Sequence, residues 1–219
     1  LGQARSHRGG ALQADALSGR AAAGVVLLGH VGGSLWPFFA ASPEAADGRP
    51  DPLDRWSRRA IDALARAFDA AALYPFGGPP FLPFQRWALR AEPLSPSPLG
   101  ILIHPEYGLW HGYRGALAFA EPLALPAPAP RPSPCESCAT KPCLSACPVD
   151  AFTGTEYRVD LCRPQLGRED GRACMAGGCL ARNACPVGRA HAYPAAQIRF
   201  HMAAFERAGR SKPVAPPEH

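Results

Sequence analysis

The chain has 219 residues and a formal net charge of +5, which is carried almost entirely by Arg. This charge forms no Lys/Arg block of the kind that marks a nucleic-acid surface, so a specific nucleic-acid partner is not expected. With 47% hydrophobic residues a buried core is feasible and a disordered chain is disfavoured, while 26 Pro and 22 Gly argue against long helical bundles.

The start of the chain predicts a short helix followed by a buried strand. The helix is expected over 11–18, and the apolar run 22–31 has the length and the Val and Gly content of a strand. This run is too short to cross a bilayer, and no apolar signal core precedes it. We therefore expect a soluble, cytoplasmic protein without a membrane partner.

A longer helix is expected to follow Asp51. Asp51 is a favourable N-cap, Pro52 is a favourable first helical residue, and Pro75 ends the pattern. The stretch 75–87 is rich in Pro, Gly and aromatic residues and is not expected to be regular. The apolar residues at helical spacing are Trp56, Ala60, Ile61, Leu64, Phe68 and Ala71.

The middle of the chain predicts a hairpin and then a linker. Two strands, 99–104 and 109–120, are expected to pair across a tight turn. Six prolines in 121–134 indicate an extended, semi-rigid linker. A last helix is expected over 194–208. We therefore predict an α+β protein with two domains, 1–125 and 126–219.

All eight Cys residues lie in the predicted second domain. An even number of Cys can indicate disulfides, but the expected cytoplasmic location favours metal binding. The first group has the spacing C-x2-C-x4-C-x3-C-P and the last has C-x4-C-x5-C-P. Bacterial ferredoxins have a similar run, in which the Cys before Pro binds the second of two clusters. The expected ligands are Cys135, Cys138, Cys143 and Cys185 for one [4Fe–4S] cluster, and Cys147, Cys162, Cys174 and Cys179 for the other.

Zinc and free structural Cys are the alternatives to iron–sulfur clusters. Two tetrahedral zinc sites would also use eight thiolates. Zinc modules favour paired C-x2-C knuckles, however, and Cys135 with Cys138 is the one such pair here. The two Cys-Pro endings have no particular role in zinc sites, so iron–sulfur clusters are favoured.

The Cys-containing domain resembles the dicluster ferredoxin domain of epoxyqueuosine reductases and reductive dehalogenases, which feeds electrons to the cobalt of a corrinoid. The segment 104–115 fits H-P-x-x-G-x-W-x-x-x-R-G, which resembles a region of the CblC (MMACHC-type) proteins. The resemblance implies a flavin-reductase or nitroreductase-like α+β fold for the first domain, with a pocket for cobalamin or another corrinoid. It implies cofactor contacts by His104, Gly108, Trp110 and Arg114.

Other interpretations of these residues stay open. His104 could lie on the pocket rim, bind a metal, or form hydrogen bonds within the turn before Pro105. The base-off signature D-x-H-x-x-G is absent, so a permanent axial cobalt ligand is not expected at His104. Arg114 could bind the corrin edge or pair with Glu106. The aromatic residues that could wall a corrin pocket, or simply fill a core, are Phe76, Phe81, Phe84, Trp87, Trp110 and Tyr113.

These patterns predict an iron–sulfur redox protein that passes electrons through two [4Fe–4S] clusters to a bound cofactor or substrate. A corrinoid is the favoured acceptor, with cobalamin reduction or upper-ligand removal as the reaction and a ferredoxin, flavodoxin or reductase as the redox partner. One alternative is a ferredoxin-type electron carrier without catalysis, and another is a zinc-stabilised interaction module. Whether the chain is an enzyme, such as a corrinoid-linked reductase, stays open, and no catalytic residue is assigned.

Overall fold

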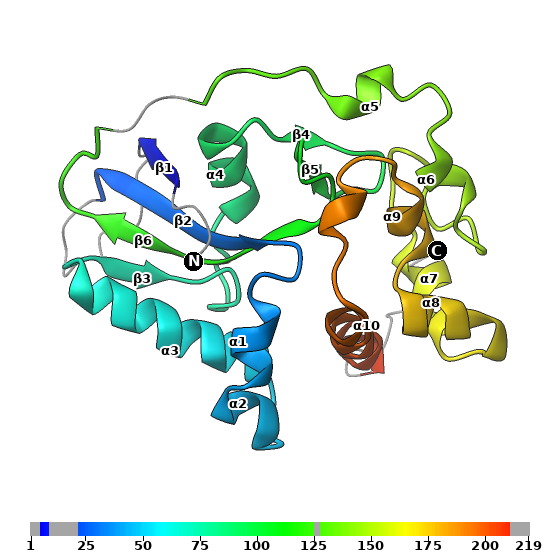
Figure 1. Ribbon diagram of the computed structural model, residues 1–219, viewed down its shortest axis with the longest axis horizontal. Coiled ribbons are helices and arrows are strands. Elements are labelled where there is room, and N and C mark those ends of the chain that lie inside the picture. Colours follow the sequence, from blue (N-terminus) through cyan, green and yellow to red (C-terminus); the bar gives the residue numbers. More distant parts are fainter. Residues whose placement is uncertain (1–4, 9–21, 125–127, 211–219) are drawn as a thin grey trace, which may run out of the picture. The chain divides into compact units, whose positions relative to one another are not determined.

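The computed structural model describes residues 5–8, 22–124 and 128–210 (Figure 1). The expected helix over 11–18 lies outside the described residues. The protein mixes helices and strands, so the predicted α+β class is confirmed. The chain divides into two compact units, Leu1–Ser95 with Trp110–Pro132 and Pro96–Leu109 with Ser133–His219. The second unit therefore includes a segment that the expected boundary at residue 125 assigned to the first.

The first unit contains an antiparallel sheet of four strands in the order β1-β2-β6-β3. The predicted strand over 22–31 is present as β2, and its first four residues are all buried because both faces of the sheet are covered. Figure 1 shows α3 and α4 on opposite sides of this sheet. The strands are β1 (Arg5–Arg8), β2 (Gly24–Val31), β3 (Ala71–Leu73) and β6 (His111–Phe119).

The helices of the first unit are α1 (Trp36–Ala40), α2 (Pro43–Ala46), α3 (Pro52–Ala67) and α4 (Phe84–Ala91). The helix expected after Asp51 is α3, although the Asp51 side chain makes no capping hydrogen bond. Phe68 was expected on its buried face but is 60% exposed. The buried face of α3 is shifted by about one residue along the sequence from the face that the apolar spacing predicts. It consists of Leu53, Ser57, Ile61 and Ala65.

Two expectations for the middle of the chain are wrong. The stretch 75–87 ends in the first turn of α4, where Phe84 and Trp87 are buried; the Pro-rich residues before them hide this helical spacing. The long hairpin does not form, because β6 pairs with β2 and β3 inside the sheet. A short strand, β5 (Leu102–Ile103), pairs instead with β4 (Ser95–Pro96).

The second unit consists of short helices and tight turns around a small core. Its last helix was predicted over 194–208 and is present as α10. None of the helices among the described residues is long and apolar enough to cross a membrane. The helices are α5 (Pro134–Ser137), α6 (Pro142–Ser145), α7 (Val159–Leu166), α8 (Arg172–Gly177), α9 (Leu180–Ala184) and α10 (Ala195–Arg210), with 3-10 turns at Glu169–Gly171 and Arg189–His191.

Candidate metal centres

One cavity of the second unit brings together four thiols. Cys135 lies in α5 and Cys143 in α6, whereas Cys138 and Cys185 follow the last residues of α5 and α9. The start of α5 is fixed by Ser133, whose hydroxyl oxygen accepts a hydrogen bond of 3.4 Å from the backbone N–H of Cys135. The cavity has a volume of about 20 Å³, roughly the space of one water molecule.

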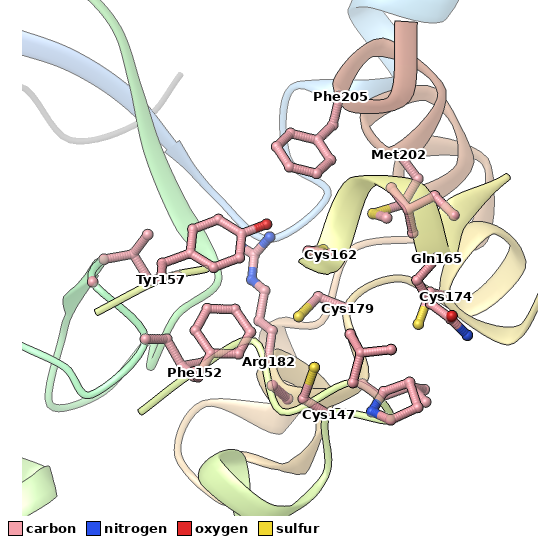
Figure 2. A pocket seen from close by; sticks show the side chains of 18 residues that line it. Cys147, Phe152, Tyr157, Cys162, Gln165, Cys174, Cys179, Arg182, Met202 and Phe205 are labelled. Atoms are coloured by element: carbon pink, nitrogen blue, oxygen red, sulfur yellow. The ribbon is translucent and has the colours of Figure 1, made fainter. Parts of the chain in front are cut away.

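A second cavity, of about 360 Å³, brings together the remaining four thiols. Cys162 lies in α7 and Cys174 in α8, Cys179 precedes α9, and Cys147 accepts a hydrogen bond of 3.3 Å at its sulfur from the backbone N–H of Ala151. These four Cys residues are labelled in Figure 2. Each of the two expected ligand sets therefore lines a cavity of its own.

Three aromatic residues, Phe152, Tyr157 and Phe205, line the second cavity (Figure 2). The rings of Phe152 and Tyr157 stack with centroids 4.6 Å apart at an interplanar angle of 12°. Phe205 of α10 lies beyond Tyr157 at 6.5 Å. The Tyr157 hydroxyl donates a hydrogen bond to Cys162, and burial together with this bond raises the pKa of Tyr157. The sequence did not single out Tyr157, and no local pattern marks it.

Burial is the main cause of the raised pKa of five of these thiols. It raises the pKa of Cys162, Cys174 and Cys179 at the second cavity. At the first cavity, burial and then the neighbouring charge of Cys185 raise the pKa of Cys135 and Cys143. Burial raises a thiol pKa because the charged thiolate loses its hydration. Thiols gathered in this way favour a bound cation, which compensates the charge of several thiolates at once.

The two sets of four thiols fit two [4Fe–4S] clusters, although the two cavities differ in volume. Four thiols are the ligands that each such cluster takes, and the larger cavity has room for one. The smaller cavity is the narrower of the two, about 20 Å³ against about 360 Å³. Among the residues that the structure describes, no three His, Cys, Asp or Glu side chains are gathered closely enough to hold a single metal ion.

Arg182 is a further residue of the second cavity that the sequence did not indicate. It lies in α9, three residues after Cys179, and its guanidinium packs 4.5 Å from the centre of the Tyr193 ring. Its Nη2 donates a hydrogen bond to the backbone carbonyl oxygen of Leu109. Arg182 therefore places a positive charge beside a cavity of thiols and also links α9 to the segment before the linker.

His104 and Gly108 lie in the second unit and contact residues of that unit. His104 is 4% exposed, and its Nδ1 accepts hydrogen bonds of 3.0 and 3.1 Å from the backbone N–H groups of Glu106 and Tyr107. Its backbone pairs with that of Gly108 in both directions at 2.9 Å. Of the interpretations left open for His104, the structure shows the hydrogen-bonded turn.

Trp110 and Arg114 lie in the first unit. Trp110 is 3% exposed. Arg114 forms an ion pair with Asp54, and its Nε donates a hydrogen bond of 3.0 Å to the hydroxyl of Ser57. The suggested pairing of Arg114 with Glu106 is therefore wrong, because the guanidinium is directed at α3. Among the aromatic residues proposed as pocket walls, Phe84 and Trp87 are buried and Phe81 is 68% exposed.

Comparisons with known proteins give little beyond this geometry. No family model matches the chain, and no curated protein matches it. A solved structure of epoxyqueuosine reductase with an epoxyqueuosine-modified stem loop of tRNA-Tyr is similar over 79% of this chain, with 18% identity and a TM-score of 0.46. The chain covers 50% of that protein's length. A similarity this low assigns neither fold nor function.

Proposed function

We propose that the chain is an iron–sulfur redox protein whose second unit carries electrons through two [4Fe–4S] clusters. The observation that carries the proposal is the division of the eight Cys residues into two sets of four, each around its own cavity. A bound cluster of this kind supplies one-electron transfer. The two Cys-Pro steps support the same assignment, because Cys147 and Cys185 each line the cavity opposite to that of the Cys preceding them in sequence.

The residues around the thiols would tune the clusters. The Tyr157 hydroxyl and the backbone N–H of Ala151 donate hydrogen bonds to sulfur atoms of the second set. Such bonds raise the reduction potential of a cluster because they stabilise the extra negative charge of its reduced form. The rings of Phe152, Tyr157 and Phe205 give that cavity an apolar lining.

The four residues that the resemblance assigned to a corrinoid differ in their surroundings. Arg114 is engaged by Asp54 and Ser57, and Trp110 is buried in the first unit. His104 and Gly108 belong to a turn of the other unit that packs against the same unit. These contacts engage His104, Gly108 and Arg114 within the protein.

The proposal is tested by reductive titration of the anaerobically purified protein. Two [4Fe–4S] clusters should take up about two electrons per chain from dithionite, with bleaching of the visible absorption and return of the colour on addition of an oxidant. A zinc-stabilised module would be colourless and take up no electrons. Addition of cob(II)alamin to the reduced protein then tests whether a corrinoid accepts these electrons.

A further inference from the structure

The segment Pro96–Leu109 belongs to the Cys-containing unit although it precedes the first Cys in sequence. Leu99, Ile103 and Leu109 are each 4% exposed or less, and they share one buried cluster with Cys185. Ile103 also lines the first cavity, and Leu99 lines the second. The segment is therefore part of the core on which the Cys-containing turns are built.

Two glycines bring this segment into backbone contact with a Cys-containing turn. Gly108 has φ +58° and Gly188 has φ +70°, the left-handed conformation that side chains disfavour. A Cβ atom at Gly108 would lie 2.1 Å from the carbonyl oxygen of Val187. A Cβ atom at Gly188 would lie 2.3 Å from the carbonyl carbon of Tyr107. A Cβ atom at either glycine would overlap backbone atoms of the opposite turn. A side chain at either position must therefore push the two turns apart.

The turn contacted in this way begins at Cys185. Cys185 ends α9, and Gly188 follows it by three residues and begins the 3-10 turn Arg189–His191. Arg189 Nε donates a hydrogen bond of 3.2 Å to the carbonyl oxygen of Cys185, and the ring of His191 meets that of Tyr107 edge-on at 5.2 Å. The position of Cys185 is therefore set from both sides, by its own turn and by the turn that contains Gly108.

We propose that Gly108 and Gly188 are positioning residues that hold Cys185 at the first cavity through direct backbone contact. The turn His104–Gly108 then serves as a rigid support for a cluster ligand. Naming Cys185 a ligand rests on the proposed function, whereas the contact between the turns and its effect on the Cys185 side chain do not. The support concerns the first cavity, because Cys185 is one of the four thiols that line it.

The test compares Gly108→Ala with Gly154→Ala in the full chain. Gly154 also has a left-handed conformation, φ +94°, lies in the same unit and lines neither cavity, but a Cβ atom there meets only a Leu144 methyl group at 3.6 Å. Both variants place Ala at a positive φ, which is the less favourable for Ala at Gly154, and Gly108→Ala alone adds the backbone clash. In the reduced, metal-free chain, the alkylation rate of the buried Cys185 thiol is followed by peptide mapping, with Cys174 as internal reference.

We expect Gly108→Ala to raise the alkylation rate of Cys185 about tenfold over that of Gly154→Ala, with Cys174 unchanged, because local opening exposes the thiol. In the loaded protein, Gly108→Ala should retain about four of about eight iron atoms and show only one reduced-cluster signal in electron paramagnetic resonance. Gly188→Ala should behave in the same way. Equal Cys185 reactivity and equal iron content in the Gly108 and Gly154 variants would overturn the inference.

A milder pair of variants keeps the test decisive if Gly108→Ala does not fold. His104→Asn retains an acceptor for the backbone N–H groups of Glu106 and Tyr107, and His104→Ala removes it. Cys185 should become more reactive in His104→Ala and be protected again in His104→Asn; equal reactivity in both would contradict the inference. A wild-type protein without iron and sulfide would refute the proposed function, while the alkylation comparison would still decide whether the glycines position Cys185.

Discussion

Cys185 and Cys135 line the same cavity, although they lie at opposite ends of the Cys-containing part of the chain. Cys185→Ala should therefore remove one ligand of the first cluster, and iron should fall from about eight to about four atoms per chain. Cys174→Ala should cause the same loss at the second cavity. Iron and sulfide analysis measures the loss, and electron paramagnetic resonance of the reduced variants should show two different remaining signals. Identical remaining signals would contradict the division into two sets.

The hydrogen bond from Tyr157 to Cys162 predicts a change in potential at one cluster only. Tyr157→Phe keeps the ring and removes the donor, so the second cluster should become harder to reduce and its potential should shift to a more negative value. The shift is measured by a redox titration followed by electron paramagnetic resonance. Tyr113→Phe is the control, because Tyr113 lies in the first unit and lines neither cavity. An unchanged potential in Tyr157→Phe would show that the hydroxyl does not tune the cluster.

Arg114 is predicted to stabilise the first unit. Arg114→Ala removes the ion pair with Asp54 and leaves the buried Ser57 hydroxyl without its guanidinium partner, so the free energy of unfolding should fall by about 1–2 kcal/mol. Urea unfolding measures this loss, and the iron content of the folded protein should stay unchanged. Arg66→Ala, at an exposed position of α3, the helix that contains Asp54 and Ser57, should change the free energy of unfolding by less than about 0.5 kcal/mol. Equal stability of the two variants would contradict the role of the ion pair.

The ion pair of Glu44 with Arg59 predicts a loss of stability in acid. Arg59 donates two hydrogen bonds to the carboxylate, at 2.5 and 2.9 Å, and lowers the pKa of Glu44 to about 2. A carboxylate with a lowered pKa in the folded state stabilises the protein above its unfolded pKa of about 4.3, and this contribution is lost as the pH falls towards 2. The melting temperature of the wild type should therefore be higher than that of Glu44→Gln at pH 6. The difference between the two melting temperatures should be smaller at pH 3. A constant difference would refute this assignment.

The sequence predicted those parts of the protein that have a local signal. The strand over 22–31, the helix after Asp51 and the last helix are all marked by continuous apolar runs or by helical periodicity, and all three are present. The face of α3 was misjudged because Ser57 is buried under Arg114, a contact with a distant strand that periodicity does not report. The start of α4 was missed because Pro83 and the prolines before it dominate the local composition.

The candidate site also has parts that local sequence patterns predict and parts that they do not. The four-and-four grouping could be anticipated because the Cys-Pro steps at Cys147 and Cys185 are local patterns with a physical meaning. The membership of Pro96–Leu109 in the second unit could not, since it depends on contacts such as that of Gly108 with Gly188, 80 residues along the chain. Tyr157 and Arg182 were missed for the same reason, as each is placed by tertiary packing.

The count of iron, sulfide and zinc in the anaerobically purified protein tests the central claim most directly. Two [4Fe–4S] clusters, one in each set of four Cys, predict about eight iron and about eight sulfide per chain, with zinc absent. About two zinc per chain without sulfide would contradict the claim and assign both Cys sets to tetrahedral structural sites.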